Sequence, residues 1–175
     1  MKVGEIAQLI EATLPLGWQE SYDNTGLAVG NPEAEVTTIL VALDATEEVV
    51  EEAIAMGAQM VVTHHPIIFR PIKQLAWANR QQRTIAKAIA AGVALYAAHT
   101  NLDSAPTIGI SHLLATKLGL REEGLLEPSA EMGVGIGIVG SQPVPQMTAA
   151  VMPQSGYLAR MVRAMKEPME WPKSK

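Results

Sequence analysis

The sequence predicts an α/β protein in which a mostly parallel sheet is flanked by helices. Short apolar, β-branched runs alternate with longer amphipathic segments, which is the order expected of parallel strands joined by right-handed helical crossovers. Glycine follows three of the amphipathic segments, at Gly57, Gly92 and Gly119, where helices typically end. The chain has 175 residues, 48% of them hydrophobic, which is enough to bury a core in one domain or in two small ones.

The expected elements of the first 120 residues follow from periodicity and end signals. Strands are expected at 27–29, 38–43, 60–63 and 93–98. The strand at 38–43 is apolar throughout and is interpreted as buried. Helices are expected at 3–14, 44–56, 77–91 and 106–118. Asp44 and Glu47 resemble a capping box at the start of the second helix, and Pro106 is a residue favoured in a first helical turn.

The pattern changes after residue 120. Residues 133–140 alternate glycine with apolar side chains and resemble G-x-G-x-x-G, but no strand-turn-helix frame surrounds them. We interpret them as a glycine-rich edge strand and not as a dinucleotide site. Further on, a helix is expected at 156–165 and an unpacked tail at 168–175. The expected domains are an α/β domain over 1–140 and a divergent, partly helical segment over 141–175.

Composition and charge exclude several classes of protein. No apolar run approaches the roughly 20 residues that a membrane-spanning helix needs, so no membrane association is expected. The first residues lack the apolar core of a signal peptide. There are no cysteines, so a metal must be bound by histidines and carboxylates, and the cytoplasm is the expected compartment. A net charge of −5 argues against a nucleic-acid partner.

Three of the four histidines lie in two clusters, each directly after an expected strand. Thr63-His64-His65-Pro66 follows one strand, and His99-Thr100-Asn101-Leu102-Asp103 follows the next along the chain. Ligands of open α/β sheets bind at that edge, and imidazole with carboxylate suits zinc, iron or manganese. Adjacent histidines on extended backbone point to opposite sides, which favours two metal ions with one histidine each and Asp103 as a bridge.

Each of these residues also has a purely structural interpretation. A histidine pair before proline can simply end a strand, and Asp103 can cap a helix. Helix capping fully explains Asp44, and His112 is expected to be a surface or packing residue of a helix. Tyr22-Asp23-Asn24 is typical of a turn. His99 is expected to orient a ligand or a substrate without binding a metal directly.

Three motifs occur in a fixed order along the chain. They are Tyr22-Asp23-Asn24-Thr25-Gly26-Leu27, Thr63-His64-His65-Pro66-Ile67-Ile68-Phe69 and Tyr96-Ala97-Ala98-His99-Thr100-Asn101-Leu102-Asp103. In order and spacing they resemble the GTP cyclohydrolase 1 type 2 homologues, also called NIF-three-like dinuclear-metal proteins. The resemblance covers about residues 1–120 and is weaker through Gly140. It implies the first lobe of a two-lobed α/β fold, a ring-like homohexamer and two divalent metal ions.

The resemblance also implies roles for individual residues. The direct metal ligands would be His64, His65 and Asp103. The residues close to the metals or the substrate would be His99, Asp23 and Asn24. It assigns no catalytic residue. The family's remaining ligands are a histidine and a glutamate near the C-terminus, whereas this chain has no histidine after His112 and ends at Lys175. Only half of the family's ligand set is therefore expected in this chain. Three alternatives account for this: a truncated piece, a naturally short divergent copy, or one half of a split protein.

Three functions follow from these observations. The first is a metal-dependent, cyclohydrolase-like hydrolase in which metal-bound hydroxide attacks a nucleotide-like small molecule. The second is a non-catalytic metal-binding or scaffold protein, favoured by the missing ligands. The third is an inactive, truncated copy that is held together by association with itself. Further copies of the chain are the expected protein partners in a homo-oligomer.

Overall fold

The computed structural model describes residues 1–141 and 148–151. The chain divides into two compact units, Met1–Leu102 and Asp103–Lys175. The division expected from the sequence, at residue 140, stays a prediction. The expected helix at 156–165 and the expected tail at 168–175 lie outside the described residues.

The first unit is built on a four-stranded sheet in the order β1-β4-β3-β2. Its strands are β1 (Gly26–Val29), β2 (Ile39–Ala42), β3 (Met60–Thr63) and β4 (Ala94–Ala97). Strands β2, β3 and β4 run parallel and in register, and β1 pairs antiparallel with β4. The prediction of a mostly parallel sheet in an α/β fold is confirmed.

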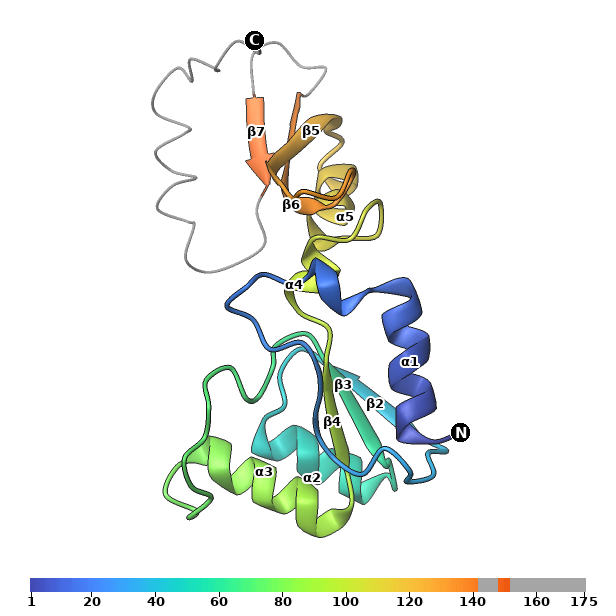
Figure 1. The fold of residues 1–175 in the computed structure, drawn as a ribbon, viewed down its shortest axis with the longest axis vertical. Helices are drawn as coiled ribbons and strands as arrows, with labels where there is room; N and C mark the ends of the chain where they lie inside the picture. The colour runs from blue at the N-terminus through green and yellow to red at the C-terminus, as the bar shows by residue number, and fades with distance from the viewer. Residues whose placement is uncertain (142–147, 152–175) are drawn as a thin grey trace. The chain divides into compact units, whose positions relative to one another are not determined.

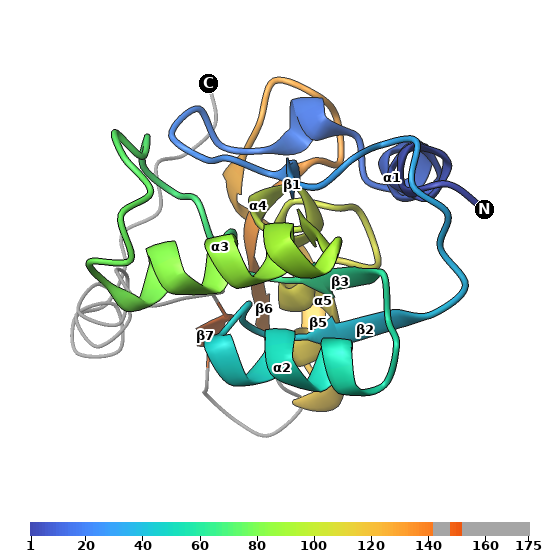
Figure 2. The same ribbon diagram turned by 90° about the horizontal axis from the view of Figure 1, so that it is seen from below.

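Two helices cover one face of this sheet. Helices α2 (Glu47–Ala55) and α3 (Arg80–Ala91) lie side by side along it (Figures 1 and 2). Their apolar stripes pack on the central strands in the main core, which consists of Val29, Val50, Ala53, Ala58, Val61, Ile85, Ala88, Val93 and Leu95. Gly92, with a φ of 69°, ends α3 in the left-handed conformation, as the sequence predicts.

The N-terminal helix α1 (Val3–Thr13) lies apart from these two helices (Figure 2) and is followed by the short 3-10 helix η1 (Leu16–Trp18). Its buried residues are Val3, Ile6 and Ala7. Burial, together with the charge of Glu11 on α1, raises the pKa of Tyr96 on β4 to about 12. The face of β4 that carries Tyr96 is therefore the face toward α1.

Strand β2 forms as expected but is not buried. Ile39 and Val41 are 39% and 74% exposed, and only the alternate residue Leu40 packs against the main core. The reason is its position, because β2 is the edge strand of the sheet and helices α2 and α3 cover only one face.

Three helix starts differ from the prediction. Helix α3 begins at Arg80 and not at residue 77, because Asn79 is its cap. Thr46, and not Asp44, caps α2, since its hydroxyl accepts a hydrogen bond from the backbone N–H of Val49 at 3.3 Å. The helix expected at 106–118 begins later, as α5 (Ile110–Lys117), and the separate short helix α4 (Thr100–Asp103) precedes it. Thr107 has a φ of 63°, and this left-handed backbone interrupts a right-handed helix.

The second unit contains an antiparallel sheet of β5 (Arg121–Pro128), β6 (Gly135–Ser141) and β7 (Thr148–Val151), in that order. The glycine-rich segment is therefore a strand, as predicted, but a central one. A Cβ atom at Gly135 or Gly140 would lie 2.5 or 2.6 Å from a carbonyl oxygen of β5. Glycine at these positions lets the β5 backbone approach closely.

Among the described residues, no helix has the length and apolar character that crossing a membrane requires.

The corrected cap makes a stability prediction. Thr46→Ala is expected to lower the free energy of unfolding by about 1 kcal/mol, because a helix N–H loses its acceptor. Asp44→Ala removes only a half-exposed pair with His65 and is expected to lower it by about 0.2–0.5 kcal/mol. Urea denaturation followed by circular dichroism measures both values, and the reverse order would show that Asp44 is the cap.

Candidate metal centre

Two parallel strands deliver the histidines to one edge of the sheet. Thr63 pairs with Ala97 at the ends of β3 and β4, and the ladder continues with a hydrogen bond from Ala98 N–H to the Thr63 carbonyl at 2.9 Å. His64 and His99 follow directly. The sequence prediction that the two clusters meet at the carboxyl edge of the sheet is therefore confirmed.

Three histidines form a compact group at this edge. One ring nitrogen of each of His64, His65 and His99 lies within 4.8 Å of one ring nitrogen of the other two. The ring centroids are 4.9 to 5.6 Å apart. His64 is buried, with 7% of its surface exposed, and the other two are partly buried. His99 therefore belongs to the group itself, whereas the sequence predicts that it orients a ligand or a substrate.

Each of the three rings uses its Nδ1 atom for a hydrogen bond to a protein acceptor. His64 Nδ1 lies 2.9 Å from the carbonyl oxygen of Ala98. His65 Nδ1 lies 2.7 Å from Oδ1 of Asp44, and His99 Nδ1 lies 2.9 Å from Oδ1 of Asp23. A carbonyl or a carboxylate can only accept, so Nδ1 carries the proton in each ring. In the neutral imidazole the lone pair is then on Nε2, which is the atom that could bind a metal.

The electrostatics of His64 favour the neutral form. Burial is the main cause that lowers the pKa of His64, and the neighbouring rings of His99 and His65 add to the effect. The hydrogen bond to the Ala98 carbonyl raises the pKa of His64, but by less than burial lowers it. A neutral imidazole is the form that binds metal ions.

Asp23 is a buried carboxylate that anchors His99. Burial disfavours its charge, but hydrogen bonds from the His99 ring, the Thr100 hydroxyl and the backbone N–H groups of Asn24 and Thr100 outweigh burial and hold the pKa of Asp23 well below its usual range. The Thr25 hydroxyl donates a further bond at 3.0 Å. The carboxylate therefore stays charged at neutral pH and fixes the orientation of His99.

Asn24 connects the same turn to the loop that follows the histidine pair. Its side-chain Nδ2 donates to the carbonyl oxygen of Ile68 at 2.6 Å. The turn at 22–24 thus holds both His99, through Asp23, and the loop beyond His65, through Asn24.

Asp103 and His112 belong to the second unit. Asp103 is the last residue of α4 and the first of the second unit, is 3% exposed, and is not a member of the three-histidine group. Its role as a metal ligand stays a prediction. His112 lies on α5 with its Nδ1 2.9 Å from Oε2 of Glu122, so it makes a local pair within the second unit.

Asp44 is a functional residue that the sequence does not predict. The sequence assigns it only a helix-capping role, but in the structure its carboxylate holds His65. One signal could have found it. Asp44 follows β2 just as His65 follows β3, two residues past the last pair Ala42 and Thr63, and parallel neighbours end at the same edge of a sheet.

The spacing of the group suits divalent cations. Two imidazole nitrogens that share one tetrahedral zinc lie about 3.4 Å apart, given Zn–N distances of about 2.0–2.1 Å. The 4.8 Å limit of the group admits one ion after small side-chain shifts, and it also admits two ions that share the histidines.

Comparison with known proteins agrees with the resemblance seen in the sequence. The family model of Duf34/NIF3 (NGG1p interacting factor 3) matches residues 1–169. The chain is 39% identical over 138 residues to a GTP cyclohydrolase 1 type 2 homolog of Clostridium perfringens, covering 77% of this chain and 52% of the relative. It thus spans about half the length of the curated relatives that it matches first.

Solved structures show the same relationship. A Bacillus cereus protein related to NIF3 superposes with a TM-score of 0.68 at 40% identity, covering 74% of this chain and 35% of the other. Reduced HcgD from Methanocaldococcus jannaschii superposes with a TM-score of 0.67 at 30% identity, covering 80% and 54%. The α/β fold, the three motifs and the match over residues 1–169 agree, and the chain belongs to the Duf34/NIF3 family.

Proposed function

We propose that this chain binds divalent metal ions through Nε2 of His64, His65 and His99, and that the metal serves the hydrolysis of a nucleotide-like small molecule. One observation carries the metal site: the Nδ1 atom of each histidine in the group is held by a protein acceptor. Metal-binding histidines in proteins show this arrangement, because it fixes the tautomer and the direction of the ligand atom.

The chemistry of the donors supports zinc, iron, manganese or a similar ion. Imidazole nitrogens suit these metals, and the chain has no cysteine to compete. Two carboxylates, Asp44 and Asp23, stand directly behind two of the rings and would offset part of the charge of a bound cation. A pair of ions with Asp103 as a further ligand is the arrangement that the resemblance implies.

When bound, a divalent metal supplies a Lewis acid and a water of lowered pKa. The protein's own part is to hold the ligands. Asp44 and the Ala98 carbonyl fix two of the rings from the ends of β2 and β4, and Asp23 fixes the third from the turn before β1. The names of the relatives as GTP cyclohydrolase 1 type 2 homologs support a nucleotide-like substrate.

Metal binding without turnover is the second candidate. It is favoured because both carboxylates beside the group already accept hydrogen bonds from histidines, so neither is an obvious general base. Incubating the metal-loaded chain with purine nucleotides and separating the products by chromatography distinguishes the two. Product that forms with wild type and not with His65→Ala supports the hydrolase, and no product with any divalent ion supports the second candidate.

We expect the three histidines to retain metal together. After equilibration with zinc and gel filtration, elemental mass spectrometry should find at least one ion per wild-type chain and strongly reduced metal in His64→Ala and His99→Ala. His112→Ala is the matched control, because it removes a histidine outside the group. A wild-type chain without metal, or an equal loss in the control, would contradict the site.

Asp44 should matter for metal affinity. Asp44→Asn keeps the size of the side chain but removes the charge behind His65, and removal of such a partner typically weakens metal binding by about 10- to 100-fold. Competition against a chromophoric chelator measures the change. Glu48→Gln is the control. It removes the same charge from a nearby residue, but Glu48 pairs with Arg80 and not with a histidine. Unchanged affinity in Asp44→Asn would show that the contact is only structural.

We also propose that copies of the chain associate, in a homohexamer as the resemblance implies. Exposed apolar side chains on and next to the edge strand β2 support association, namely Ile39, Val41 and Leu43 at 39%, 74% and 61% exposure. Light scattering after gel filtration should give a mass several times the 18.7 kDa of one chain. A single species at the mass of one chain would disprove self-association.

A further inference from the structure

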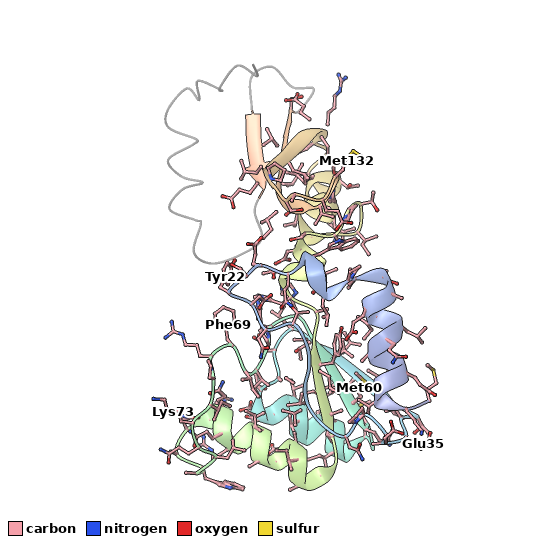
Figure 3. The ribbon with its side chains drawn as sticks, in the orientation of Figure 1. Tyr22, Glu35, Met60, Phe69, Lys73 and Met132 are labelled. Carbon is pink, nitrogen blue, oxygen red and sulfur yellow. The ribbon has the colours of Figure 1, made fainter. Side chains whose placement is uncertain are left out.

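Two exposed aromatic rings lie next to the histidine group. Phe69, the single phenylalanine of the chain, is 43% exposed, and Tyr22 is 56% exposed. Their ring centroids are 6.3 Å apart, and the Phe69 centroid is also 6.3 Å from the His99 ring. Figure 3 shows the two side chains one above the other. Large rings left in water beside a polar group are surfaces on which flat ligands stack.

Phe69 also lines a cavity of about 430 Å³ whose charged residues are both cationic. Arg70 and Lys73 line it together with Gln74, Gln81 and Gln82. No carboxylate is among its described lining residues. The volume is within the range of small-molecule sites, roughly 300–1,000 Å³.

The charge of this cavity is not balanced locally. In the part of the chain that the structure describes, no ion pair includes Arg70 or Lys73, whereas Arg80, Arg83 and Lys87 all pair with glutamates of α2. The chain as a whole carries a net charge of −5, and at this cavity two cations without a carboxylate partner among the described residues lie beside glutamine residues. Guanidinium, ammonium and amide groups together provide the donors that phosphate oxygens accept.

The loop that carries these residues is held at both ends. Asn24 and Gln81 donate side-chain hydrogen bonds to the carbonyls of Ile68 and Ile67. At the other end, the Gln82 side-chain oxygen accepts from the backbone N–H groups of Ala76 and Ala78 at 3.1 and 3.2 Å. A site on a loop that is fixed in this way loses less conformational entropy when a ligand binds.

We infer that this loop binds a planar aromatic ring that carries a phosphate. The ring stacks on Phe69 and Tyr22, and the phosphate enters the cavity of Arg70 and Lys73. Phe69 contributes to both parts, and its contact with His99 places the ring end of the ligand beside the proposed metal site. The inference names the substrate class of the proposed function and rests on that function for its catalytic meaning, but the binding itself needs no metal.

The test uses the full chain after removal of metal with a chelator. Calorimetric titrations compare guanosine 5′-monophosphate with its two halves, guanosine and ribose 5-phosphate, and with inorganic phosphate. The whole ligand should bind at least about tenfold more tightly than either half, because its two parts add their binding free energies. Ribose 5-phosphate that binds as tightly as the whole ligand would overturn the aromatic part of the inference.

Substitutions separate the two contacts. Arg70→Gln should weaken the nucleotide and ribose 5-phosphate about tenfold and leave guanosine unchanged, since one charged hydrogen-bond donor is lost. Phe69→Leu should weaken the nucleotide and guanosine by a similar factor and leave ribose 5-phosphate unchanged, whereas Phe69→Trp should retain binding. Lys117→Gln, an exposed lysine on α5, is the charge control.

Each result decides the inference. Nucleotide affinity that is unchanged in Arg70→Gln, or changed equally in Lys117→Gln, overturns the phosphate cavity. Equal affinity in Phe69→Leu and Phe69→Trp overturns stacking, and the thermal midpoint of each variant excludes unfolding as the cause. Because no metal is present, a failure of the metal site leaves these results unaffected. Metal binding without nucleotide binding would overturn this inference alone.

Discussion

The parallel pairing of β3 with β4 is the constraint on which the site depends. The hydrogen bond between the Ala98 N–H and the Thr63 carbonyl extends the ladder past the ends of both strands, and the bond from His64 to the Ala98 carbonyl crosses between the same two segments. A slip of one residue in either strand would send its side chains to the opposite face of the sheet. The register of the sheet and the geometry of the histidines are thus one structural feature.

The acceptors behind the three rings are not equivalent. His64, the most buried ring, is held by a neutral carbonyl, whereas the more accessible His65 and His99 are held by carboxylates. A second charge beside His64 would require desolvation at a deeper position, where burial already favours the neutral ring. Asp23 can carry its charge in a buried place because several N–H and O–H donors surround it.

Much of the first unit could be predicted because local patterns determine it. The strand at 60–63, the end of α3 at Gly92 and the meeting of the histidine clusters all follow from periodicity, end signals and the geometry of parallel strands. Asp44 was assigned to the wrong role because Asp44 and Thr46 both suit a helix start, and only the three-dimensional position of His65 separates them.

Other features depend on contacts between distant segments. The glycine-rich strand β6 is central because residues 148–151 pair with it, and nothing within 133–140 indicates that partner. The exposure of Val41 likewise depends on β2 being at the edge, which the apolar run itself does not show. Phe69 and Tyr22 come from separate motifs, so their contact was not visible in either one.

The bond between Asp23 and His99 also has a consequence for how the chain matures. These residues are 76 positions apart, so Asp23 lacks its histidine partner until most of the first unit has been synthesised. At about 5–20 residues per second, a ribosome needs roughly 4–15 seconds to cover that distance. During this interval Asp23 is an ordinary solvated carboxylate and His99 does not yet exist, so assembly of the histidine group is a late event of biosynthesis.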